Sequence, residues 1–191
     1  RIIMHHHVKR ALLCGAAAAS LMFAVGCNAA LPFTGNSVDL DRTYTADAEI
    51  TCGKTNAAAE ITRCGGGEWK IAFTEPKSLA GIKLSLDENG YTAELGELTF
   101  TAENNAEYTT AAEIIASAID DVAENGTGGT VEDGVLSFNS DFGGKNIVVS
   151  VSEETGELVS LKCPSYRLAV YFSGQEDFTP IDPDEGGLVE E

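Results

Sequence analysis

The chain has 191 residues, of which 30 are acidic and 12 basic, so its formal net charge is −18 at pH 7. A chain this acidic is repelled by nucleic acid and by anionic lipid head groups, which excludes both as expected partners. All three histidines stand at residues 5–7. The remainder therefore offers none for a Ser-His-Asp or Cys-His nucleophile, or for histidine-bound zinc.

Residues 1–26 have the layout of a secretory signal peptide. Lys9 and Arg10 precede the apolar run ALLCGAAAASLMFAV, which is shorter than the about 20 residues that a membrane span needs. The run ends in FAVGC, which resembles the lipobox of bacterial lipoproteins. This resemblance implies that Cys27 receives a lipid and anchors the protein on the outer face of the cytoplasmic membrane. The alternative is an ordinary secretory signal, cut near Ala29 and Ala30, which would remove Cys27.

The segments that flank the expected domain differ from it in composition. Residues 27–42 are mostly small and polar, and they predict a flexible tether. Residues 43–173 are expected to form a single domain. Residues 174–191 are acidic and contain two prolines and a glycine pair, which predicts a disordered or loosely packed tail.

The domain begins with segments in which apolar and polar residues alternate, which is typical of strands. These segments are 44–52, 57–64, 68–74, 82–86, 91–95 and 98–100, and Asn89-Gly90 is typical of a tight hairpin turn. Residues 110–123 break this rhythm with helical spacing, and Thr110 with Glu113 can form a capping box. Four more strands are expected at 135–140, 146–152, 157–163 and 167–173.

Strict alternation indicates sheets with one apolar and one polar face, as in antiparallel structure. Strands and helices do not alternate along the sequence, which argues against a parallel sheet. The sequence therefore predicts a mainly β (α+β) fold. It consists of a strongly curved antiparallel sheet of about ten strands, whose apolar face is covered by one amphipathic helix.

Residues 48–55, AEITCGKT, match the loose form of a phosphate-binding loop, but their surroundings do not. Such a loop follows a buried parallel strand and opens a helix. Here the preceding strand alternates, and only nine residues separate Thr55 from the triple glycine at 65–67. We therefore expect residues 53–56 to form a hairpin turn, and we expect no bound nucleotide. In this hairpin Cys52 and Cys64 lie roughly 20 Å apart, too far for a disulfide.

The segment FTEPKSLAGIKLSLDENGYTAELGELTF, residues 73–100, and the order of the elements resemble the bacterial lipoprotein-carrier superfamily. The similarity is to LolA, LolB and LppX-like proteins in their lipid-anchored Gram-positive form. It covers about residues 43–173 and rests on Phe73, Pro76, Leu79, Gly81 and Gly90. It implies a half-open β-barrel with a helix on its concave side, and an apolar concavity that holds acyl chains without catalysis.

The side chains expected to line this interior are the apolar members of the alternating strands and of the helix. They are Trp69, Ile71, Phe73, Ile82, Leu84, Leu86, Leu98, Phe100, Ile115, Ile119 and Val122. Each of them could equally be part of a plain core. A cavity exists only if the sheet and the helix fail to close on each other.

The sequence leaves two functions open. The first is a non-catalytic lipoprotein, anchored to the membrane through Cys27, that binds an acyl chain, a lipid or a lipidated protein without a cofactor or a metal. The alternative is a closed-core structural or protein-interaction lipoprotein of the cell envelope or of spore assembly. An apolar pocket of about 300 Å³ or more would favour the first. A carboxylate hydrolase is a third reading, but no recognisable constellation supports it.

Overall fold

Eleven strands and one α-helix make up the described part of the computed structural model, which comprises residues 38–103 and 110–179. The helix is α1 (Ala111–Asn125), and a 3-10 helix, η1 (Pro164–Tyr166), lies between the last two strands. The strands are β1 (Tyr44–Cys52), β2 (Thr55–Gly65), β3 (Glu68–Glu75), β4 (Ile82–Asp87), β5 (Gly90–Leu95), β6 (Leu98–Glu103), β7 (Thr130–Glu132), β8 (Val135–Phe142), β9 (Lys145–Ser152), β10 (Leu158–Cys163) and β11 (Leu168–Asp177).

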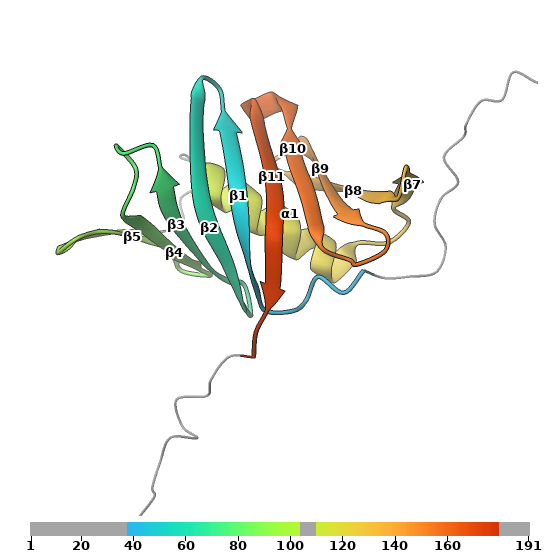
Figure 1. Ribbon diagram of the computed structural model, residues 1–191, viewed down its shortest axis with the longest axis horizontal. Coiled ribbons are helices and arrows are strands. Elements are labelled where there is room, and N and C mark those ends of the chain that lie inside the picture. The colour runs from blue at the N-terminus through green and yellow to red at the C-terminus, as the bar shows by residue number, and fades with distance from the viewer. Residues whose placement is uncertain (1–37, 104–109, 180–191) are drawn as a thin grey trace, which may run out of the picture.

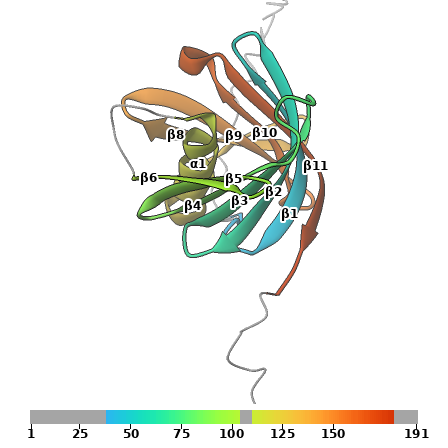
Figure 2. The ribbon, with the colours of Figure 1, turned by 90° about the vertical axis from the view of Figure 1, so that its left-hand side faces the viewer.

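All eleven strands belong to one antiparallel sheet with the order β6-β5-β4-β3-β2-β1-β11-β10-β9-β8-β7. Only β1 and β11 are neighbours that lie far apart in the chain, and their pairing joins two meanders at the centre of the sheet (Figure 1). Because β6 and β7 are free edges, the sheet is open rather than a closed barrel. Figure 2 shows the sheet bending around α1, which lies inside the curve.

The predicted mainly β class and the curved antiparallel sheet are confirmed, and every predicted strand is present. The strand β7, which has only three residues, was not predicted from the sequence. The signal that marks β7 is Asp133-Gly134, whose residues both have positive φ, 51° and 77°. An Asp-Gly pair in this conformation forms the type of turn that joins two antiparallel strands.

The segment AEITCGKT belongs to a hairpin, as predicted, but the turn is shorter than the predicted residues 53–56, because Thr55 and Asn56 already belong to β2. Cys52 pairs with Thr55, so Gly53 and Lys54 form a two-residue turn in which Gly53 has a φ of 63° and Lys54 is exposed. The antiparallel register places Arg63, the residue before Cys64, beside Tyr44 at the other end of β1. Cys52 and Cys64 are accordingly free thiols, as is the buried Cys163.

The helix forms where the sequence predicts it, because both of its ends are satisfied locally. The hydroxyl of Thr110 accepts a hydrogen bond from the backbone N–H of Glu113 at 3.2 Å. The Glu113 carboxylate in turn accepts from the Thr110 backbone N–H at 2.6 Å, which completes the capping box. At the other end the Gly126 N–H donates to the carbonyl of Val122 at 2.8 Å.

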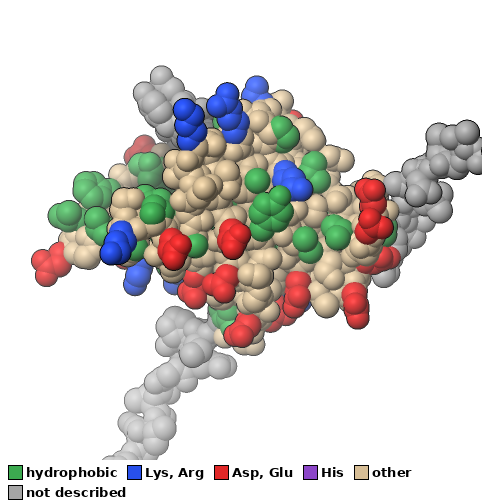
Figure 3. All heavy atoms as spheres, turned by 45° about the horizontal axis from the view of Figure 1, so that its top comes forward, with side chains coloured by type: hydrophobic (Ala, Val, Ile, Leu, Met, Phe, Trp, Pro, Cys, Tyr) green, Lys and Arg blue, Asp and Glu red, His purple; other side chains and the backbone are tan. Residues whose placement is uncertain are grey.

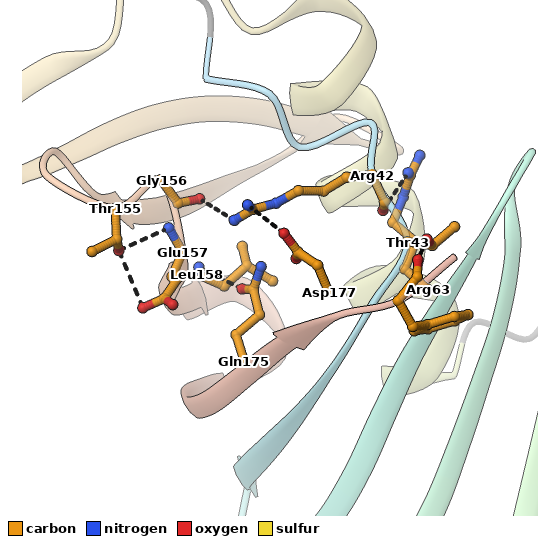
Figure 4. Close-up of polar contacts among 10 residues, drawn as sticks. Arg42, Thr43, Arg63, Thr155, Gly156, Glu157, Leu158, Gln175 and Asp177 are labelled. Carbon is orange, nitrogen blue, oxygen red and sulfur yellow. Dashed lines mark hydrogen bonds and ion pairs between the residues drawn. The ribbon is translucent and has the colours of Figure 1, made fainter. Parts of the chain in front are cut away.

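The domain begins earlier and ends later than the sequence predicts. Leu40, expected in the tether at residues 27–42, is fully buried in the core. The neighbouring Arg42 donates to Asp177 at 2.9 Å and to the Gly156 carbonyl at 3.3 Å (Figure 4). The end of β11 at Asp177 places residues 174–177, expected in the tail, in the sheet. An ion pair and a buried leucine thus fix segments whose composition alone suggests disorder. The signal peptide and Cys27 lie outside the described residues.

Candidate functional site

Across β3 to β6, every side chain on the inner face of the sheet is apolar. Paired residues of antiparallel strands point to the same side, so the register defines three rows that cross these strands. The first row is Trp69, Leu86, Tyr91 and Ala102, and the second row is Ile71, Leu84, Ala93 and Phe100. The third row is Ile82, Leu95 and Leu98, and Phe73 continues this row on β3.

The inner face becomes progressively more exposed from β3 towards the edge strand. Trp69 and Ile71 on β3 are 1% exposed, whereas Leu95 on β5 is 47% exposed. Leu98 and Phe100 on β6 reach 59% and 62%. The apolar face therefore continues beyond the part that the core covers. We call its half-buried and exposed members on β4 to β6 the open face: Ile82, Leu84, Tyr91, Ala93, Leu95, Leu98, Phe100 and Ala102.

The helix explains why only part of the sheet is covered. It packs mainly against β8 and β9, at the opposite end of the sheet from β6. In Figure 2, β4, β5 and β6 lie on the near side of the curve, in front of α1. The predicted interior residues therefore divide into three groups. Trp69, Ile71, Leu86, Ile115, Ile119 and Val122 are buried in the core, Phe73, Ile82 and Leu84 are half-buried, and Leu98 and Phe100 are exposed.

The side chains at the contact between α1 and the sheet are buried. Ile115 and Ile119 of α1 are 1% and 0% exposed, as Trp69 and Ile71 are 1% exposed on the strand side. The described part of the chain has hollows of about 360, 390 and 440 Å³, and none of these three is lined by a residue of α1.

These hollows lie along strands whose outward side chains are polar. The 360 Å³ hollow is bordered by Lys70, Ser85, Thr92 and Thr101, which all lie on the outer face. In Figure 3, charged side chains are scattered over the visible surface, and hydrophobic ones lie at the left-hand end, where Figure 1 places β4 and β5, as well as over the middle of this view. None of these three hollows lies between α1 and the sheet, and three exposed large hydrophobic side chains, Leu95, Leu98 and Phe100, lie on the open face.

Arg63 of β2 forms hydrogen bonds with the helix and with the start of the domain. Its guanidinium donates to Asp120 of α1 at 2.9 Å, to Asp41 at 3.0 Å and to the Arg42 carbonyl at 3.1 Å. It also lies over the ring of Trp69 at 5.9 Å. Burial alone would lower the pKa of Arg63, but the hydrogen bonds to Asp120 and Asp41 outweigh it, so the pKa is raised and Arg63 stays charged.

Asp120 and Tyr44 complete this buried polar group. The second carboxylate oxygen of Asp120 accepts from the Trp69 indole N–H at 2.8 Å. Tyr44 packs edge-on against Trp69, with ring centroids 6.2 Å apart, and its hydroxyl has no hydrogen-bond partner among the residues that the structure describes. Burial raises the pKa of Tyr44, although Arg63 acts in the opposite direction. This group could not be predicted from the sequence, because Asp120 lies 57 positions from Arg63 and 51 positions from Trp69.

The geometry defines an open, curved, antiparallel β protein with one helix inside the curve and an apolar face left uncovered. No family model and no curated protein matches the chain. Among solved structures, it is similar to an uncharacterized conserved protein from Thermus thermophilus. That similarity has 8% identity and a TM-score of 0.49, and it covers 80% of this chain and 89% of that one.

The chain is also similar to a LolA superfamily protein from Nitrosomonas europaea. Here the identity is again 8%, the TM-score is 0.39, and 78% of this chain and 92% of that chain are covered. Similarity at this level concerns the arrangement of strands alone.

Two further observations concern the described residues only. They include no helix that is long and apolar enough to cross a membrane. They also include no group of three or more His, Cys, Asp or Glu residues placed to hold a metal ion.

Proposed function

We propose that the protein is a non-catalytic, membrane-anchored lipoprotein that binds an acyl chain, as part of a lipid or of a lipidated protein. The acyl chain lies on the open face of β4 to β6, and Cys27 carries the anchor. The observation that carries this proposal is that the inner face stays apolar up to the edge strand β6. The helix α1 does not cover this part of the face, because it packs at the other end of the sheet.

The energetics favour a bound apolar group. Full burial of a Leu or Phe side chain contributes about 1.5–3 kcal/mol, and Leu98 and Phe100 are each about 60% exposed. Covering these two residues alone thus contributes roughly 2–4 kcal/mol, and Leu95 and Leu84 add to it. Contiguous exposed apolar surface of this kind marks sites of binding to ligands, membranes or proteins.

Native mass spectrometry of the full chain carrying Cys27→Ala, purified without detergent and mixed with dodecyl maltoside below its critical micelle concentration, tests the proposal. We expect a retained dodecyl adduct, which the double variant Leu98→Ser/Phe100→Ser loses. The matched control is Tyr171→Ser, which removes a 51% exposed aromatic side chain from the outer face. Equal adducts on all three proteins, or none on any, would exclude the open face as the acyl-binding site.

The closed contact between helix and sheet favours the second function, a structural or protein-interaction lipoprotein with a complete core. Under this alternative a partner protein, rather than a lipid, covers Leu98 and Phe100. The Leu98→Ser/Phe100→Ser variant then loses that partner in pull-downs from cell envelopes, while no dodecyl adduct forms on any variant.

A further inference from the structure

The strand β6 forms one edge of the sheet and lacks the features that usually protect an edge. No strand among the described residues pairs with its free side. Natural edge strands are protected by lysine, proline, a bulge or shortness. The six residues of β6, LTFTAE, pair with β5 without a register shift and include neither lysine nor proline. The opposite edge strand, β7, has only three residues, so its shortness protects that edge.

The register shows which backbone groups of β6 point away from β5. Leu95 and Leu98 enclose the two-residue turn between the strands, so they form a hydrogen-bonded pair. Because bonded and non-bonded pairs alternate along an antiparallel ladder, every second residue from Leu98 onwards bonds to β5. The N–H and C=O groups of the residues between them, Thr99, Thr101 and Glu103, therefore face the free edge.

From this arrangement we infer that β6 pairs antiparallel with β6 of a second copy of the chain, about a two-fold axis at Thr101. In this register Thr101 lies opposite Thr101 of the second copy, and Thr99 lies opposite Glu103. All three edge-facing residues then exchange backbone hydrogen bonds with the second copy, and like charges do not lie opposite each other. The inference goes beyond the proposed function and does not depend on acyl binding.

A second copy of β6 matches both faces of the first. On the outer face the two Thr101 side chains become neighbours, and cross-strand pairs of threonine are stabilising. On the inner face the exposed Phe100 lies opposite Ala102 of the second copy, so a large side chain meets a small one in each of two symmetric pairs. Within β6 only Glu103, at its end, is charged, so two copies can approach along this edge although the chain has a net charge of −18.

The same features predict that the assembly is a closed and weak dimer. Pairing of β6 with itself uses the same surface on both copies, so it ends at two copies. The other edge strand is too short to continue the sheet. Six residues on each copy are fewer than the about 20–30 on each side of a standard interface, so the dimer should form only at high protein concentration.

Sedimentation equilibrium of the full chain carrying Cys27→Ala, without detergent and from about 5 to 500 µM, tests the inference. We expect a reversible rise towards twice the mass of one chain and no larger species. Thr101→Lys places two lysines opposite each other, and we expect it to lower the association constant at least about tenfold. The matched control is Thr92→Lys, because Thr92 pairs with Thr101 on the same face, one strand further from the edge. We expect this control to leave the association constant within about twofold.

Cysteine substitutions test the register. The Cα atoms of two residues that form a hydrogen-bonded pair lie about 5.5 Å apart, within the range that a disulfide spans. We therefore expect Thr101→Cys to form a cross-linked dimer in oxidised glutathione, with peptide mapping to show that position 101 is joined to position 101. Thr99→Cys, on the same face of the same strand, should not cross-link, because the two copies of position 99 lie four residues out of register.

A monomer at every concentration would overturn the inference and indicate that something other than a second copy covers this edge. Equal effects of Thr101→Lys and Thr92→Lys, or equal cross-linking at positions 99 and 101, would overturn pairing about Thr101. The dodecyl-adduct experiment is independent of these results. A monomeric chain that retains the adduct leaves the proposed function standing, whereas a dimeric chain without the adduct refutes only the proposed function.

Discussion

The contact between Asp120 and Arg63 offers a quantitative test of how α1 is held on the sheet. Asp120→Ala removes the acceptor of both the Arg63 Nε–H and the Trp69 indole N–H, each bonded within 2.9 Å. The Arg63 side chain, only 4% exposed, would keep one carboxylate partner, Asp41, which is itself 73% exposed.

The expected cost follows from this burial. Removal of one partner from a buried ion pair typically costs about 3–5 kcal/mol, and an orphaned buried donor costs about 1–3 kcal/mol. Because the Asp120 side chain is 22% exposed, water can reach part of the vacated site, so we expect a loss of about 3 kcal/mol. Asp41→Ala removes the same charge from the same arginine, but at an exposed position, and should cost less than about 1 kcal/mol.

Urea unfolding followed by the fluorescence of Trp69, the single tryptophan of the chain, measures both variants. With an m-value of about 2 kcal/mol/M, the transition midpoint should fall by roughly 1.5 M for Asp120→Ala and by less than about 0.5 M for Asp41→Ala. Asp120→Asn keeps an acceptor for the indole N–H and should fall between them. Equal shifts for the two alanine variants would refute the idea that burial makes Asp120 the dominant partner.

Two further predictions concern Tyr44 and Cys27. The buried Tyr44 hydroxyl has no partner among the described residues, so Tyr44→Phe should leave stability at pH 7 unchanged or slightly increased. Folding raises the pKa of Tyr44, so the stability that its protonated hydroxyl contributes is complete below the unfolded pKa of about 10 and is lost as the pH rises towards the folded pKa. Between about pH 10 and 11.5 the free energy of unfolding should therefore fall less for Tyr44→Phe than for the unmodified chain. An equal fall in the two proteins would contradict this. Palmitate labelling of cells should be lost in Cys27→Ala, and undiminished labelling would disprove the anchor.

The strands and the helix could be predicted because their signals are local. Alternation from Trp69 to Phe73 and from Ile82 to Leu86 defines which side chains share a face. The predicted turn is present between β4 and β5, but Asp87 pairs with Gly90, so its two central residues are Glu88 and Asn89 rather than Asn89 and Gly90. The capping box at Thr110 fixes the first residue of the helix in the same local way. The three-residue β7 escaped because so short a strand shows too little alternation to be recognised.

The division between core and open face could not be read from the sequence. Trp69 and Phe100 occupy equivalent apolar positions in alternating strands, yet one is 1% and the other 62% exposed. The difference depends on where α1 lies across the sheet. Its position is set by packing against β8 and β9 and by the Arg63–Asp120 contact, which joins residues 57 positions apart.

The sequence by itself thus determined the type of sheet, the apolar side of each strand and the extent of the helix, because these depend on neighbours within a few residues. Tertiary structure alone decided which apolar residues are covered, since burial depends on contacts between distant segments. It also decided that Leu40 and residues 174–177 belong to the domain. Leu40 is buried in the core, and residues 174–177 extend β11, which pairs with β1.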